Sequence, residues 1–165
     1  MEVTVLRRLF SFPNPVNEVS ARLVAAGVVG MCVATVVFDQ PWLTVVIAYG
    51  FVARVLTGPT LSPLGQFVTR VVTPRLNRPA RLVPGPPKRF AQGIGAAVST
   101  ASAVLLAAGL APAAWVLLAV LIAAASLEAF AGFCLGCTIF GFLQRRGLIP
   151  EDVCEACNNI SLRGA

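Results

Sequence analysis

Five cysteines are the residues best able to do chemistry in this chain, and four of them form two pairs near its C-terminal end. Each pair has the spacing Cys-x-x-Cys: Cys134 with Cys137, and Cys154 with Cys157. Two cysteines on one helical turn can close and reopen a disulfide, so this spacing is typical of thiol redox chemistry. The fifth, Cys32, lies in a long apolar stretch and is predicted to be a small buried side chain. The two pairs are therefore the candidate catalytic residues.

Three interpretations of the pairs are open. In the first, the four cysteines exchange electrons or sulfane sulfur with another thiol. In the second, they bind a structural zinc ion or iron–sulfur cluster, because sixteen residues separate the pairs and this spacing matches a four-thiolate site. In the third, they are buried side chains without chemistry. A permanent disulfide framework is disfavoured in a reducing compartment.

The chain contains no histidine, which narrows the possible chemistry. Imidazole is the commonest proton shuttle and metal ligand in proteins. Nucleophilic catalysis by a Ser-His or Cys-His pair also requires it. Most hydrolase mechanisms are therefore excluded, and whether the chain is an enzyme stays open.

Three ionisable residues, Glu128, Arg54 and Arg22, interrupt otherwise apolar stretches. An ionisable side chain at depth in a membrane is costly unless it pairs, snorkels to the interface or faces water. One interpretation is a substrate-binding site in which Glu128 meets Arg54 or Arg22 to hold an anion or tune a thiol. The other is two snorkelling arginines and one ion pair that locks the helices together.

The elements that carry these residues are apolar helices. Of the 165 residues 57% are hydrophobic and the mean hydropathy is +0.82, which is typical of membrane proteins. A hydrocarbon core of roughly 30 Å needs about 20 apolar residues of helix. We therefore predict an all-α polytopic membrane protein, a single domain over residues 1–165 with four transmembrane helices arranged as two helical hairpins. The predicted spans are residues 17–38, 41–57, 89–110 and 112–143.

The last predicted span is longer than a bilayer requires, so it is expected to tilt or to break at Gly132 or Gly136. Cys134 and Cys137 would then lie near the C-terminal end of a helix, on a face turned away from Glu128. A helix C-terminus raises the pKa of a thiol. Such cysteines are expected to be acceptors or ligands rather than strong oxidants.

A basic, proline-rich segment, residues 58–88, joins the hairpins, and a polar tail, residues 144–165, carries the second cysteine pair. Within the segment, Ser62 and Pro63 predict the start of an interfacial amphipathic helix that ends at Pro74. Lys and Arg flank the spans on this side, whereas the two short turns carry none. The positive-inside rule therefore predicts that both termini are cytoplasmic. The net charge of +6 then indicates contact with the lipid bilayer, and nucleic acid is not an expected partner.

Four ordered stretches, FPNPVNE, GPPKRFAQGIG, LEAFAGFCLGC and GLIPEDVCEAC, resemble the uncharacterised bacterial integral membrane proteins grouped as domain of unknown function 4395, DUF4395. The resemblance extends from about Phe12 to Cys157. It implies a short multi-pass protein of the bacterial cytoplasmic membrane with both Cys-x-x-Cys pairs. It also implies the company of thioredoxin-like and rhodanese-type proteins, which are the expected partners. It assigns no catalytic residue.

The leading hypothesis is thiol redox or sulfane-sulfur chemistry at the cytoplasmic face, carried by Cys134, Cys137, Cys154 and Cys157. A structural zinc or iron–sulfur site formed by the same four cysteines is the first alternative. A non-catalytic partner subunit or a small-anion transporter is the second, and the charges within the apolar stretches suggest it.

Overall fold

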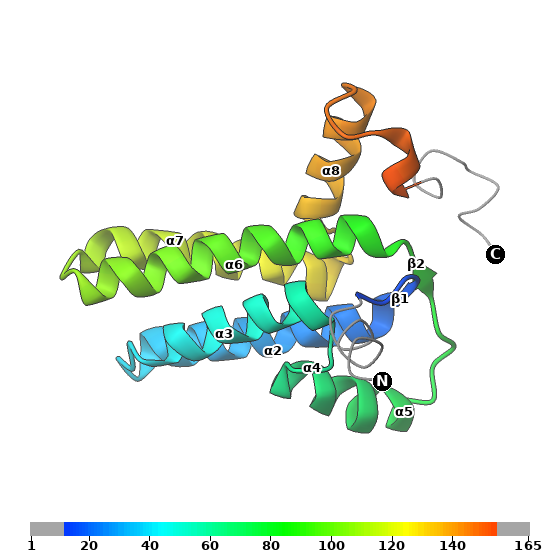
Figure 1. Cartoon of the computed structure of the whole chain (residues 1–165). Coiled ribbons are helices and arrows are strands. Elements are labelled where there is room, and N and C mark those ends of the chain that lie inside the picture. Colours follow the sequence, from blue (N-terminus) through cyan, green and yellow to red (C-terminus); the bar gives the residue numbers. More distant parts are fainter. Residues whose placement is uncertain (1–11, 155–165) are drawn as a thin grey trace, which may run out of the picture.

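Four helices lie side by side and are joined in two pairs by short turns (Figure 1). The computed structural model describes residues 12–154. The first pair turns at residues 38–42 and the second at residues 108–110, and both turns lie at the same end of the molecule (Figure 1). The other end carries the connection between the pairs and a further helix. Within residues 12–154 the helices of ten residues or more are α2 (Glu18–Val37), α3 (Leu43–Thr57), α6 (Gly85–Ala107), α7 (Ala111–Ser126) and α8 (Leu135–Arg145).

The all-α prediction is confirmed, but four transmembrane helices are not. Among the described residues, three helical stretches are long and apolar enough to cross a membrane: α2, α6 and Ala111–Ala131. Helix α3 is apolar but has only 15 residues, about 22 Å of helix, which is shorter than a hydrocarbon core of roughly 30 Å. The two hairpins are thus present, and one of their four helices is too short to span by itself.

The starts of α2 and α6 are fixed by local sequence signals. The side chain of Asn17 accepts a hydrogen bond from the backbone N–H of Val19 at 3.0 Å and so caps α2. Helix α6 begins at Gly85 with two prolines in its first turn, where a missing N–H costs nothing. It therefore starts four residues before the predicted Arg89, and this brings Lys88 into the helix.

A short strand pair holds these two helix starts together. Strand β1 (Val16–Asn17) pairs antiparallel with β2 (Leu82–Val83), with Val16 opposite Val83. The N–H of Glu18 donates to the carbonyl of Arg81 at 2.7 Å, and the two side chains form an ion pair at 2.9 Å. The two hairpins are therefore joined by backbone pairing at the end that carries α8.

The first part of the connection between the hairpins is helical, as predicted. This part consists of α4 (Pro63–Phe67), the π-helical turn η1 (Val68–Val72) and α5 (Thr73–Arg75). Ser62 caps it by accepting a hydrogen bond from the N–H of Gly65 at 3.2 Å. The helix continues beyond Pro74 to Arg75, contrary to the prediction, because Pro74 lies in the first turn of α5 and no donor is needed there.

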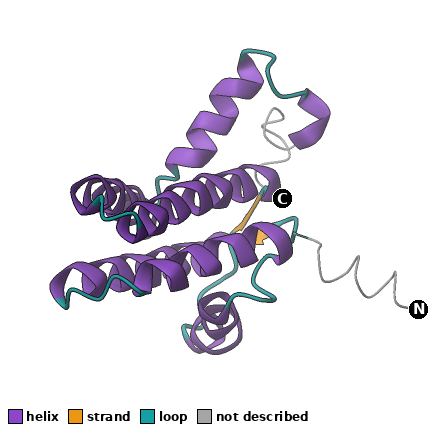
Figure 2. Ribbon diagram, turned by 60° about the vertical axis from the view of Figure 1, so that its left-hand side comes forward, coloured by secondary structure: helices purple, strands orange, loops and turns teal. Residues whose placement is uncertain are grey.

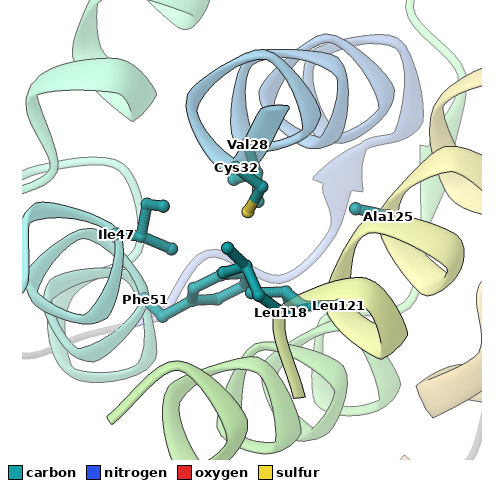
Figure 3. Close-up of a cluster of buried hydrophobic side chains, with 7 residues drawn as sticks. All are labelled: Val28, Cys32, Ile47, Phe51, Leu118, Leu121 and Ala125. Atoms are coloured by element: carbon teal, nitrogen blue, oxygen red, sulfur yellow. The ribbon is translucent and has the colours of Figure 1, made fainter. Parts of the chain in front are cut away.

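The bundle core contains Cys32 at its centre (Figure 3). Cys32 has no solvent-exposed surface, as predicted for this cysteine. A Cβ atom on Gly95 would lie 2.3 Å from the ring of Phe51, so the glycine lets α3 and α6 approach closely. The buried apolar residues of the cluster are Val28, Cys32, Ile47, Phe51, Leu118, Leu121 and Ala125.

The predicted helix over residues 112–143 is broken. Helix α7 ends in the π-helical turn η2 (Leu127–Ala131), Gly132 adopts a left-handed conformation with φ of 68°, and α8 then leaves the bundle at a steep angle (Figure 2). The N–H groups of Gly132 and Phe133 donate to the carbonyls of Glu128 and Leu127, which closes the helix end. Of the two expected breaking points, Gly132 is the one used.

Candidate functional site

Arg22 stabilises the helix end at Gly132. Its Nε donates to the carbonyl of Ala129 at 3.2 Å and its Nη2 to the carbonyl of Phe130 at 2.9 Å. Carbonyls at a helix end have no partner within the helix, so a guanidinium that reaches them replaces the missing donors. The hydrogen bonds of Arg22 thus go to the backbone beside Glu128 and not to its carboxylate.

Glu128 forms an ion pair with Lys88, whose Nζ lies 2.6 Å from the Glu128 Oε1. The pair joins α6 to η2, and only 8% of Lys88 is exposed. Sequence reasoning missed this partner because Lys88 was placed in the basic connecting segment. The signal was present in Pro86 and Pro87, which are typical of a first helical turn and would have extended the third helix to include Lys88.

Arg54 is also buried, with 5% of its surface exposed. Its Nε donates to the Gln92 Oε1 at 2.8 Å and its Nη1 to the Ser62 Oγ at 3.1 Å. The guanidinium carbon lies 4.6 Å from the centre of the Phe51 ring, a cation–π contact. Neutral dipoles and an aromatic face therefore hold the charge of Arg54, and the Glu128 carboxylate attracts it from farther away.

The break at Gly132 places Cys134 at a helix N-terminus. Cys134 is the N-cap of α8, and its Sγ accepts a hydrogen bond from the N–H of Cys137 at 3.3 Å. The prediction that this pair lies near a helix C-terminus is wrong, because it assumed one continuous helix. The N-terminal end of a helix carries partial positive charge and favours a thiolate.

The two thiols of this pair, both free and half-buried, are not equivalent. The hydrogen bond from the Cys137 thiol lowers the pKa of Cys134 below its ordinary value. The Lys88 ammonium and the Cys137 N–H lower it further, against burial and the Glu128 carboxylate. The pKa of Cys137 is raised, first by donating this hydrogen bond and then by burial. Cys134 is thus the thiol that ionises first.

Cys134 and Glu128 line the same cavity, of about 230 Å³. The prediction that the cysteine face is turned away from Glu128 is therefore wrong, since the change of direction at Gly132 packs the first turn of α8 against α6 near Ala91. Arg54 and Gln92 also line this cavity, and nearly all of its other walls are apolar. The structure thus brings together Cys134, Glu128 and Arg54 of the predicted residues, around a largely apolar space.

The second cysteine pair is only partly described. Cys154 lies in the short 3₁₀ helix η3 (Glu151–Cys154), is 5% exposed and is disulfide-bonded. The expectation that a disulfide is disfavoured is therefore not met at this cysteine. Cys157 lies outside the described residues, so its predicted role remains a prediction. Between residues 12 and 154 no group of three or more His, Cys, Asp or Glu side chains is arranged to hold a metal ion.

The family described as "Domain of unknown function (DUF4395)" matches residues 16–145. The chain belongs to this family. The DUF4395 match includes Cys134 and Cys137 together with Lys88 and Glu128, and it ends before Cys154. No curated protein and no solved structure matches the chain.

Proposed function

We propose that Cys134 and Cys137 form a dithiol that exchanges electrons or sulfane sulfur with a partner thiol protein. One observation carries the proposal: Cys134 begins a helix, its Sγ receives the Cys137 N–H, and a buried ammonium lies near it. These are the surroundings in which a cysteine becomes a nucleophile, because each of them favours the thiolate. The same arrangement is what a Cys-x-x-Cys redox pair requires of its attacking cysteine.

The lower pKa assigns the attacking role to Cys134 and the resolving role to Cys137. The Cys134 thiolate attacks one sulfur of a partner disulfide and forms a mixed disulfide, while the other partner sulfur leaves as a thiolate. Cys137 then gives its proton to that partner thiolate and attacks the Cys134 sulfur. This step closes the Cys134–Cys137 disulfide and releases the reduced partner, so two electrons have moved from the chain to the partner. The reverse sequence reduces the chain.

Sulfane sulfur uses the same nucleophile. The Cys134 thiolate attacks the outer sulfur of a persulfide R–S–SH and becomes a persulfide, and R–S⁻ leaves. Attack by Cys137 on the inner sulfur then gives the disulfide and releases hydrosulfide. Thioredoxin-like and rhodanese-type proteins present such disulfides and persulfides, and they are the class of partner that we propose.

The proposed location is the cytoplasmic side of a membrane. Helix α8 and the connection between the hairpins lie at one end of the bundle, and both short turns lie at the other (Figure 1). Residues 58–84 and the pair Arg145 and Arg146 bring positive charge to the first end, whereas the short turns contain no Lys or Arg. The positive-inside rule favours the first end as cytoplasmic, and Cys134 lies at that end.

The proposal is tested with the reduced full chain and two small probes, glutathione disulfide and glutathione persulfide. With glutathione disulfide, the unmodified chain is expected to form the Cys134–Cys137 disulfide. The C137A variant is expected to keep one glutathione on Cys134, because nothing resolves it. With the persulfide, C137A is expected to gain one sulfur atom at Cys134. Peptide mass mapping locates each product, and C134A is expected to form neither.

Two outcomes would contradict the proposal. The redox role is ruled out if Cys134 and Cys137 stay unmodified while other thiols of the same sample react with the probes. One equivalent of bound zinc per chain, with both thiols unreactive until a chelator is added, would favour the four-thiolate site instead. Zinc content and thiol reactivity are measured on the same sample, so the two outcomes are separated.

A further inference from the structure

Part of the wall of the cavity beside Cys134 is apolar and exposed, and the cavity opens there. Four of its lining residues are exposed on the outer surface of the molecule, and all four are aliphatic: Ile94 (37%), Val120 (54%), Leu135 (39%) and Ile139 (41%). They come from α6, α7 and α8, so the opening lies where these three helices meet. Helices α6 and α7 belong to the stretches that are long and apolar enough to cross a membrane. An opening of this kind admits molecules that are dissolved in lipid.

The inner wall of the cavity offers hydrogen-bond donors. Arg54 and Gln92 line it, and the carboxamide oxygen of Gln92 is already occupied by the Arg54 Nε at 2.8 Å. This bond orients the carboxamide, and within residues 12–154 the amide nitrogen of Gln92 has no hydrogen-bond partner. The site therefore combines an apolar entrance, a thiol in its wall and fixed donors at its inner end. A ligand that uses all three is apolar and carries carbonyl oxygens.

We infer that the cavity binds the ring of a lipid-soluble quinone, which accepts electrons from Cys134 and Cys137. The inference rests on the proposed function and names the electron acceptor of that same dithiol. A quinone is flat and apolar, carries two ring carbonyls and dissolves in lipid. Its carbonyls accept hydrogen bonds from the Arg54 and Gln92 side of the cavity. The volume of about 230 Å³ accommodates a ring system and leaves an attached hydrocarbon tail between the exposed side chains at the opening.

The reaction balances without a further reactant. Two thiols are oxidised to one disulfide, and this releases two electrons and two protons. The quinone takes up both electrons and both protons at its two oxygens and becomes a hydroquinone. When Cys134 reacts as the thiolate its proton has left earlier, so one proton must be returned to the site, and the Glu128 carboxylate lines the same cavity and can carry it. A reduced thiol protein then restores the dithiol by the exchange described above.

The probe is decylubiquinone, a short-tailed benzoquinone, added without oxygen to the reduced full chain in lipid nanodiscs. We expect one hydroquinone per Cys134–Cys137 disulfide, from the change in quinone absorbance and from mass mapping. Ala124 lines the cavity, and A124L is expected to slow the reaction at least tenfold by filling it. The matched control is A123L, because Ala123 is exposed and does not line the cavity. It is expected to react at the rate of the unmodified chain.

A second oxidant keeps the test decisive if A124L affects folding. Diamide is water-soluble and is expected to oxidise the thiols of A124L and A123L at equal rates. If the quinone fails to oxidise the unmodified chain, or oxidises A124L just as fast, the inference is overturned. If glutathione exchange still proceeds in that case, the proposed function stands without the quinone. If neither glutathione nor the quinone reacts with Cys134, the proposed function itself has failed.

Discussion

Cys32 and Cys134 are both free thiols, and their surroundings differ in almost every respect. Cys32 lies in the C-terminal half of α2, has no exposed surface and belongs to the apolar core (Figure 3). Cys134 is half-buried at the start of α8, near a buried ammonium, and its sulfur receives a backbone N–H. Burial in an apolar core opposes ionisation, whereas a helix N-terminus and a cation favour it. Position in the fold therefore decides which of these cysteines is a nucleophile.

The difference originates in the backbone and not in the cysteines. A continuous helix through residue 143 would leave Cys134 mid-helix, where its N–H and carbonyl are used within the helix and no free donors face its sulfur. The left-handed Gly132 ends one helix and allows another to start. Arg22, from α2, holds the ended helix by its carbonyls. A single helix break thus supplies the donor and the change of direction that the site needs.

The largest expected contrast between these two cysteines is in alkylation of the native chain. N-ethylmaleimide is expected to label Cys134 at least about 1,000-fold faster than Cys32. Cys32 becomes accessible only when the chain unfolds around it, and unfolding costs about 5 kcal/mol or more in typical domains. Labelling at pH 7 is followed by peptide mass mapping over time. In a chain unfolded by detergent and heat the two rates should converge. Fast labelling of Cys32 in the native chain would contradict the buried position.

The next largest effect is a loss of stability when Lys88 is replaced. Its ammonium makes the surroundings of Cys134 polar. The K88M variant leaves the Glu128 carboxylate unpaired with 15% of its side chain exposed, and loss of one partner of a buried pair typically costs about 3–5 kcal/mol. Thermal unfolding in nanodiscs measures the loss. The double variant K88M/E128L removes both charges and should recover most of it.

Arg81 supplies the matched control for Lys88. It also pairs with a glutamate, Glu18, at 2.9 Å; the Glu18 side chain is 14% exposed, close to that of Glu128, but 77% of the Arg81 side chain is exposed. A pair whose cation stays in water contributes little, so R81M should lower stability by about 1 kcal/mol or less. Equal losses for K88M and R81M would mean that burial of the Lys88–Glu128 pair does not matter.

Local signals in the sequence predicted the local parts of the fold. The cap by Ser62 and the two short turns follow from residues within a few positions of one another. For the break in the predicted helix over residues 112–143, the sequence left two positions open, Gly132 and Gly136. Tertiary packing decides between them. A Cβ on Gly136 would lie 2.5 Å from Ala91, so glycine at this position allows α8 to pack closely against α6. Gly132 instead adopts a positive φ, which glycine tolerates best.

Local sequence signals could not identify the cation that pairs with Glu128. Lys88 is forty residues away along the chain, and the sequence offered Arg22 and Arg54 as equally suitable cations. Which cation reaches the carboxylate depends on how α6 packs against η2, a tertiary arrangement that no local pattern encodes. The lowered pKa of Cys134 was unpredictable for the same reason, since it depends on the helix break and on that ammonium together.

The smallest expected effect is the influence of Cys137 on the pKa of Cys134. Because the Cys137 thiol donates a hydrogen bond that stabilises the Cys134 thiolate, removing this donor disfavours the charged form and raises the pKa of Cys134. C137A should therefore shift the pH midpoint of Cys134 alkylation by iodoacetamide upward, and slow the reaction at pH 7.

The C137S variant distinguishes the hydrogen bond from a change in packing. A serine hydroxyl still donates to the Cys134 sulfur, so C137S should keep the midpoint closer to that of the unmodified chain than C137A does. If both variants shift the midpoint equally, the hydrogen bond donated by the side chain of residue 137 is not the cause of the shift, and the changed packing at residue 137 is. The Lys88 ammonium and the backbone N–H of residue 137 also lower the pKa of Cys134, but both variants retain them and neither can cause the shift. Combining K88M with C137A would then show whether the ammonium or the helix N-terminus is what distinguishes Cys134 from Cys32.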